Sequence, residues 1–112
     1  MKFTEDRTGG VTVLRPMHAR LDASTAPALR EVMIDRINTG EQSIILDLGG
    51  VTFMDSSALG ALIAAAKRLS PTGTIAVAGL AAPLARLFSV TRMDRVFSVN
   101  ASVQDALKAL GG

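Results

Sequence analysis

The stretch VTFMDSSALG, residues 51–60, joins an apolar run to an amphipathic segment and decides the fold. The run before it, Ile44–Leu48, is short, rich in β-branched residues and bounded by polar or glycine residues, which predicts a buried strand. From Leu59 to Leu69 the apolar residues recur with a period of 3.6, which predicts a helix. Its expected core face consists of Leu59, Leu62, Ile63, Ala66 and Leu69. Residues 55–57, Asp-Ser-Ser, therefore lie where a loop enters a helix.

The serines at this junction allow two interpretations. Ser and Asp are common helix N-caps, because their side chains accept hydrogen bonds from the free N–H groups of the first turn. Alternatively, a hydroxyl at this end of a helix is a modification site, because a phosphate there meets free amides and the positive end of the helix dipole. The chemistry of the residues alone favours a cap and leaves a modification site open.

Three segments of the chain resemble a known family. Residues 53–60, FMDSSALG, resemble the signature of the STAS domain, as found in bacterial anti-sigma factor antagonists, which reads roughly apolar-Asp-Ser-Ser/Thr-Gly-Leu. Residues 21–29, LDASTAPAL, resemble the STAS pattern Leu-Asp-x-x-Thr-Ala-x-x-Leu, and the segment from Pro83 to Leu107 resembles the C-terminal half. Two positions depart from the family: Ala58 stands where Gly is usual, and Ala19-Arg20 replaces Gly-Glu or a similar pair.

The resemblance implies a phosphorylation-switched binding module. In the family, the serine directly after the Asp is phosphorylated by a partner kinase, and here that residue is Ser56. The residues that the resemblance and the small-residue helix face suggest for partner binding are Asp22, Asp55, Ser57, Ala58, Gly60, Ala61 and Ala64. The implied function is an anti-sigma factor antagonist. Unphosphorylated, it binds an anti-sigma factor that is also a GHKL-type serine kinase and thereby releases the sigma factor, and a PPM-type phosphatase is the implied partner that removes the phosphate.

An alternative function follows from the same family. STAS domains also occur as transport-associated subunits, for example of an ABC lipid-transport complex or an anion transporter, and many of those lack the serine. The presence of Ser56 and the stand-alone length favour the anti-sigma factor antagonist.

The remaining segments predict an α/β fold. Strands at residues 3–8 and 11–17 flank a Gly9-Gly10 hairpin turn. A helix follows from a Ser24 or Thr25 cap to about Thr39, then strands at 74–79 and 95–99 and helices that begin at Pro83 and Ser102. Strands separated by helices need parallel pairing, so we expect a mixed, mostly parallel sheet flanked by about four helices. Residues 1–112 fit one STAS-like domain.

Composition narrows the class of protein further. The chain has no cysteine, which excludes disulfides and thiolate metal sites. The net charge is only +2 and there is no Tyr or Trp, so the electrostatic stripe and stacking platform of a nucleic-acid binder are missing. The polar N-terminus is no signal peptide, and no apolar stretch is long enough to span a bilayer. We therefore expect a cytoplasmic protein that contacts neither nucleic acid nor membrane directly.

The sequence does not predict an enzyme. His18, the single histidine, would have to pair with Ser56 and an Asp, but no Gly-x-Ser-x-Gly elbow is present, so a structural role is the simpler interpretation. No metal-ligand cluster or glycine-rich phosphate loop appears, so we expect no cofactor, and nucleotide binding has no support.

Overall fold

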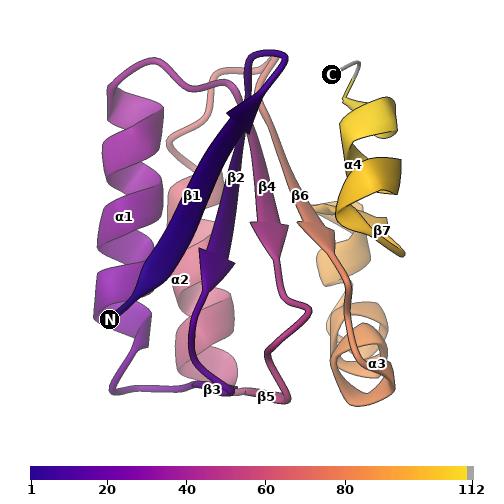
Figure 1. Cartoon of the computed structure of the whole chain (residues 1–112). Coiled ribbons are helices and arrows are strands. Elements are labelled where there is room, and N and C mark those ends of the chain that lie inside the picture. Colours follow the sequence, from indigo (N-terminus) through magenta and orange to yellow (C-terminus); the bar gives the residue numbers. More distant parts are fainter. Residues whose placement is uncertain (111–112) are drawn as a thin grey trace.

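The computed structural model describes residues 1–110, which form four α-helices around a five-stranded sheet, with a second, two-stranded sheet at one end (Figure 1). The elements in chain order are β1 (Phe3–Thr8), β2 (Val11–Pro16), β3 (Arg20–Leu21), α1 (Ala26–Asn38), β4 (Ser43–Asp47), β5 (Phe53–Met54), α2 (Ser56–Ala66), β6 (Thr74–Ala78), α3 (Ala82–Val90), the 3-10 turn η1 (Met93–Arg95), β7 (Ser98–Asn100) and α4 (Val103–Ala109).

The large sheet has the strand order β1-β2-β4-β6-β7. Only β1 and β2 pair antiparallel; the other neighbours pair parallel. The antiparallel hairpin turns at Gly9 and Gly10, whose φ angles of 56° and 81° favour glycine. The prediction of a mixed, mostly parallel sheet with four helices is confirmed.

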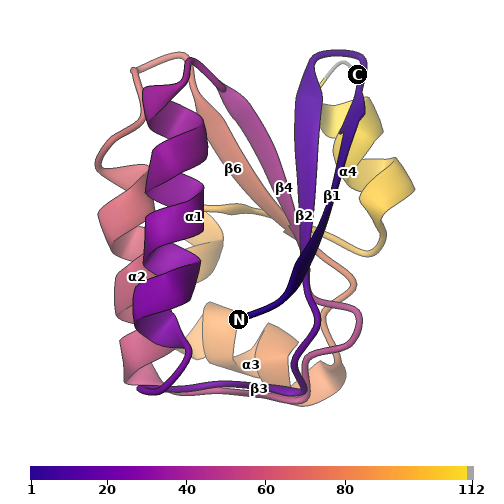
Figure 2. The ribbon, with the colours of Figure 1, turned by 60° about the vertical axis from the view of Figure 1, so that its left-hand side comes forward.

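The helices cover the two faces of the sheet unequally. The helices α1, α2 and α3 pack on one face and α4 packs on the other (Figure 2). Because successive side chains of a strand point to opposite faces, Ile44 and Leu46 enter the larger core, whereas Ile45 packs with Ala106 of α4. This two-sided burial explains why β4 reads as a continuous apolar run.

The helix α2 differs from its prediction by a rotation of its core face. The buried residues are Ala58, Leu59, Ala61, Leu62 and Ala65. Leu59 and Leu62 were predicted correctly, but Ile63, Ala66 and Leu69 are only partly buried. The cause is that α2 lies both on the sheet and alongside α1, so the face toward α1 is occupied by small side chains.

The last strand also differs from its prediction. Residues 93–95 form the turn η1, which is entered through Arg92 with a φ of 63°, and pairing with β6 begins only at Ser98. The expected strand at residues 95–99 was therefore placed too early, because a left-handed residue redirects the chain there.

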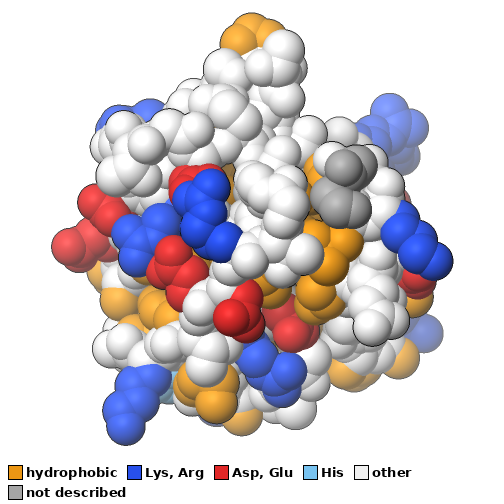
Figure 3. Space-filling model, turned by 45° about the horizontal axis from the view of Figure 1, so that its top comes forward, with side chains coloured by type: hydrophobic (Ala, Val, Ile, Leu, Met, Phe, Trp, Pro, Cys, Tyr) orange, Lys and Arg blue, Asp and Glu red, His pale blue; other side chains and the backbone are white. Residues whose placement is uncertain are grey.

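Charged side chains of both signs alternate on the side of the molecule shown in Figure 3. Ion pairs join the edge strand β1 to its surroundings: Arg36 of α1 pairs with Glu5 at 2.7 Å, and Arg7 pairs with Glu41. The Arg36 guanidinium donates to the Glu5 carboxylate and lowers the pKa of that group.

Within residues 1–110, no helix combines the length and hydropathy that a membrane crossing requires.

Candidate functional site

The two-stranded sheet brings two distant acidic residues side by side. Strands β3 and β5 pair parallel, with Leu21 opposite Met54, and the Asp55 amide donates to the Leu21 carbonyl at 3.2 Å. Asp22 and Asp55 are the next residues along each strand, so both leave the sheet at the same end. The sequence predicts a loop before α2 and predicts neither of these strands. Strands of two residues carry no periodic signal that could have predicted them.

Asp55 is the N-cap of α2. Its Oδ1 accepts from the Ala58 amide at 3.1 Å, and its carbonyl accepts from the Leu59 amide at 3.1 Å. Ser56 is consequently the first residue inside the helix rather than its cap. Ser56 and Ser57 are both exposed, and neither hydroxyl hydrogen-bonds to another described residue. The interpretation of Ser56 as a capping residue is therefore wrong.

Asp22 organises the loop that leads into α1. Its Oδ1 accepts from the Ser24 hydroxyl at 2.6 Å and from the Ser24 amide at 3.0 Å. These two bonds hold the pKa of the Asp22 carboxyl below its usual value, so the group stays negatively charged. Thr25 is the N-cap residue of α1, but its side chain makes no cap bond and instead accepts from the Asp22 amide at 2.9 Å.

Arg20 adds a positive charge beside these acids. Its guanidinium carbon lies 4.0 Å from the ring centroid of Phe53, a cation–π contact between β3 and β5. Its Nε lies 3.9 Å from Oδ2 of Asp22. Phe53 is 37% exposed, so the surface before α2 presents an aromatic ring with a cation stacked on it.

A groove runs from this end of α2 along α1. It encloses about 420 Å³ and is lined by Ala23, Ala26, Pro27 and Arg30 from the α1 side and by Ser57, Gly60, Ala61 and Ala64 from α2. A side chain at Gly60 would meet nothing within 4 Å, so the glycine leaves open space above the helix. Such space lets another surface approach the α2 backbone closely.

Two residues that we expected on the partner-binding surface are buried instead. Ala58 is 0% exposed and packs in the main core, so its side chain is not on the surface. Ala61 is 4% exposed and contributes to the wall of the groove rather than projecting from α2. Both are buried because α2 contacts the sheet and α1 at once. Of the other expected residues, none is buried: Asp22 and Asp55 directly follow β3 and β5, and Ser56, Ser57, Gly60 and Ala64 lie on α2. Their part in partner binding stays a prediction.

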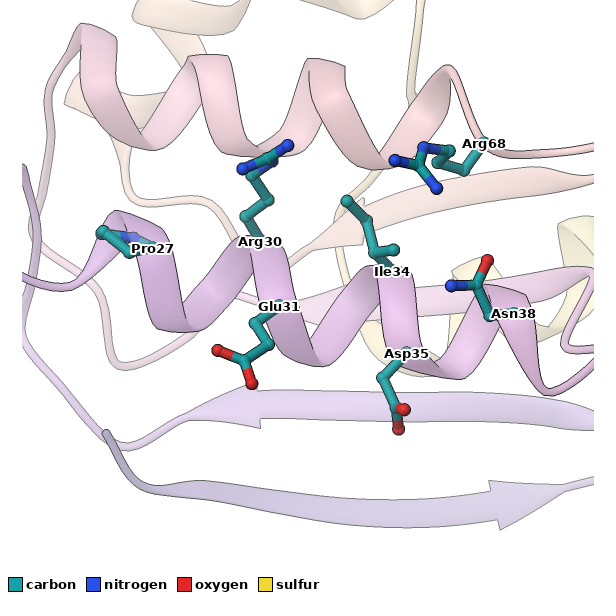
Figure 4. Close-up of a pocket in the computed structure, with 7 residues that line it drawn as sticks. All are labelled: Pro27, Arg30, Glu31, Ile34, Asp35, Asn38 and Arg68. Carbon is teal, nitrogen blue, oxygen red and sulfur yellow. The ribbon is translucent and has the colours of Figure 1, made fainter.

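A second groove, of about 490 Å³, continues the first along α1 (Figure 4). The two share Pro27 and Arg30, and the second ends at Asn38 and Arg68. The sequence does not predict the α1 residues that line either groove. The apolar period of α1 predicts its buried face but not which polar side chains border α2.

His18 is engaged away from the serines. Its Nε2 accepts from the Lys2 amide at 3.1 Å and so ties the start of the chain to the segment after β2. In the described part of the chain, no three His, Cys, Asp or Glu side chains are grouped so as to hold a metal ion.

Comparison with known proteins identifies the family of this chain. Residues 3–106 match the family model described as the STAS domain. The chain belongs to the STAS domain family. The anti-sigma-B factor antagonist of Staphylococcus aureus strain NCTC 8325 is 30% identical over 100 residues, which cover 88% of this chain and 84% of that protein.

Solved structures of other proteins share the fold. The crystal structure of an anti-sigma factor antagonist from Mycobacterium paratuberculosis has a TM-score of 0.90 at 24% identity, covering 99% of this chain and 94% of that one. The Bacillus cell fate determinant SpoIIAA, in its phosphorylated form, has a TM-score of 0.73 at 20% identity, covering 97% of this chain and 99% of that one.

Proposed function

We propose that this STAS domain is an anti-sigma factor antagonist whose binding is switched by phosphorylation of Ser56. Unphosphorylated, it binds an anti-sigma factor that is also a GHKL-type serine kinase, and the sigma factor is released. The kinase transfers the γ-phosphoryl group of ATP to the Ser56 oxygen, the hydroxyl proton is lost, and the complex dissociates. A PPM-type phosphatase hydrolyses the phosphoserine and restores binding.

The observation that carries this proposal is the free hydroxyl of Ser56. Because Asp55 caps α2, no cap bond depends on the Ser56 hydroxyl. Ser56 is exposed, so a kinase can reach it. The 30% identity to an anti-sigma-B factor antagonist supports the choice of partner, and SpoIIAA is a protein of the same fold known in a phosphorylated form.

The surroundings of Ser56 explain how a phosphate would switch binding. The modification adds about −1.5 to −2 charges. In the free protein, water and the N–H groups at the start of α2 solvate the phosphate. Inside an interface it would be desolvated close to the Asp55 and Asp22 carboxylates. A loss of about 3 kcal/mol would weaken the complex more than a hundredfold, without any change of fold.

The test needs the partner kinase of this chain, which would be sought as a GHKL-type serine kinase among the products of the neighbouring genes. Calorimetry in the ADP state should show that Ser56→Ala binds like the wild type and that Ser56→Asp binds poorly. The matched control is Ser102→Asp, which adds the same charge at the start of α4 and keeps a capping side chain there, so its affinity should be unchanged.

Mass spectrometry of the protein after incubation with kinase and ATP should find one phosphate, on Ser56. Phosphate on Ser57 alone would refute the assignment of the site. If Ser56→Asp and the authentic phosphoprotein both bound as tightly as the wild type, the switch would be refuted and the transport-associated function would become the better explanation.

A further inference from the structure

A small cavity lies beyond the carboxyl ends of the parallel strands β2 and β4 (Figure 1). Its volume is about 240 Å³, and it is lined by Arg15, Pro16, Met17, His18, Ala19 and Gly50. The carboxyl ends of parallel strands are a common position for ligands in α/β sheets. The lining contains no aspartate or glutamate, and it shares no residue with the Ser56 surface or with the grooves along α1.

The two walls of this cavity, the segment after β2 and the loop after β4, are tied together by hydrogen bonds. The Ala19 carbonyl accepts from the Thr52 amide at 2.7 Å and from the Thr52 hydroxyl at 3.1 Å. The Lys2 amide donates to Nε2 of His18 at 3.1 Å and so holds the imidazole in place. The cavity is therefore formed in the free protein, which lowers the entropy cost of binding a ligand.

Arg15 supplies the positive charge of the cavity. Its Nη1 donates to Oδ2 of Asp47 at 3.3 Å, whereas its Nη2 forms no hydrogen bond within residues 1–110. A guanidinium has five N–H donors, so the bond to Asp47 orients the group and leaves most donors available. Nη2 lies 3.5 Å from the position that a Cβ atom of Gly50 would occupy. The missing side chain at Gly50 therefore leaves space beside the guanidinium.

Two further hydrogen-bond donors belong to the cavity. Because Nε2 of His18 accepts a hydrogen bond, the neutral ring carries its proton on Nδ1. The Gly50 amide has no hydrogen-bond partner within residues 1–110. Arginine, imidazole and amide donors together match the oxygen atoms of a phosphate or carboxylate group. The cavity is smaller than the roughly 300 Å³ of the smallest pockets for drug-sized ligands, so a small ion or an end group fits it better.

We propose that this cavity binds a small oxyanion, a phosphate or carboxylate group, between the Arg15 guanidinium and the Gly50 backbone. The inference goes beyond the proposed function and does not depend on it. The ligand joins the end of β2 to the loop between β4 and β5. The Asp47 carboxylate lies outside the lining, but its negative charge beside Arg15 opposes anions, so we expect binding in the millimolar range.

The test is an NMR titration of the isotope-labelled full chain with inorganic phosphate and, separately, with acetate at constant ionic strength. In the wild type we expect the Gly50 amide signal and the Arg15 Nε signal to shift and to reach saturation. The ion that saturates these shifts at the lower concentration identifies the ligand as a phosphate or a carboxylate group.

Three variants test which groups hold the ion. Arg15→Gln removes the charge and should raise the dissociation constant at least about 10-fold. Gly50→Ala keeps every charge but places a methyl group 3.5 Å from Nη2, in the space assigned to the ion, and should weaken binding by a similar factor. Gly50 has no positive φ, so alanine is compatible with its backbone. Asp47→Asn removes the opposing charge and should lower the dissociation constant about threefold.

The control is Arg86→Gln, which removes an exposed arginine of α3 outside the lining. It changes the net charge as Arg15→Gln does and should alter the dissociation constant less than about twofold. Circular dichroism checks the fold of every variant. If Arg15→Gln does not fold, the comparison of Gly50→Ala with the wild type decides.

Three results would refute the inference. The first is a shift that stays linear up to about 50 mM of both ions, which means no specific site. The second is an affinity of Arg15→Gln or of Gly50→Ala equal to that of the wild type. The third is a saturating shift confined to the first residues of α2, which means that the ion binds at the start of that helix. None of these results involves the kinase, so the proposed function would stand.

Discussion

The helices α2 and α4 both begin with a serine close to the cap, yet the two serines are used differently. In α4, Ser102 is the N-cap and its hydroxyl accepts from the Asp105 amide at 3.1 Å. In α2, Asp55 takes that role, and Ser56 stands one position later with a free hydroxyl. The Ser102 hydroxyl is engaged in the hydrogen bond that caps α4. The Ser56 hydroxyl makes no hydrogen bond to a described residue, so a kinase could modify it without removing a cap.

The two helices also differ in what they bury. The helix α2 contributes five buried residues between the sheet and α1, whereas Ala106 is the buried residue of α4. The same kind of substitution should therefore have unequal effects in the two helices. This difference gives a series of stability measurements, which we order from the largest expected change to the smallest.

Leu62→Ala should cause the largest loss. Leu62 is 0% exposed and lies in the main core, so the substitution removes apolar contacts and leaves a cavity. We expect the free energy of unfolding in urea to fall by about 2–5 kcal/mol. Leu107→Ala, on the partly buried face of α4, should cost less than half as much. Equal losses would show that the core is not concentrated on the α2 face.

Asp55→Ala removes the cap of α2. The Ala58 amide loses its acceptor, and the negative charge at the positive end of the helix is lost as well. We expect a decrease of about 1–2 kcal/mol in the free energy of unfolding, measured by urea titration. Asp55→Asn, which keeps an acceptor oxygen, should recover most of it. An unchanged stability for Asp55→Ala would mean that Ser56 can take over the cap.

Ser102→Ala removes the cap of α4. The lost hydrogen bond joins two uncharged groups, the Asp105 amide and the Ser102 hydroxyl. We therefore expect a smaller decrease in the free energy of unfolding, of about 0.5–1 kcal/mol. Because α4 has few buried contacts, hydrogen exchange should speed up mainly in residues 103–110, whereas Asp55→Ala should affect the main core. Faster exchange of the β4 and α2 amides in Ser102→Ala would contradict this separation.

The sequence predicts those features that depend on periodicity and local capping. The apolar periods of α1 and α2 and the apolar runs of β4 and β6 give the element order and hence the mixed sheet. The sequence predicts that a helix begins at Ser102, and Ser102 is indeed the N-cap of α4. The predicted position of residues 55–57 at the start of a helix is also confirmed, because the apolar period of α2 begins directly after them.

Other features depend on contacts between distant segments and could not be predicted from local patterns. The pairing of β3 with β5 and the stacking of Arg20 on Phe53 join segments about thirty residues apart. Ala58 and Ala61 are buried because α2 packs against two neighbours at once. Asp and Ser are similarly good caps, so the sequence could not decide between Asp55 and Ser56.

Ser56→Ala should cause the smallest change in stability, and this is the sharpest test of the difference between the two serines. The substitution removes no hydrogen bond to a described residue, and alanine is compatible with the first turn of a helix. We expect the free energy of unfolding to stay within about 0.5 kcal/mol of the wild type, whereas Ser102→Ala falls below it. The same urea titration compares both variants. A loss of about 1 kcal/mol or more in Ser56→Ala would show that the hydroxyl supports the helix after all. In that case a kinase would have to compete with the fold for the oxygen of Ser56, and the main argument for a phosphorylation site there would fail.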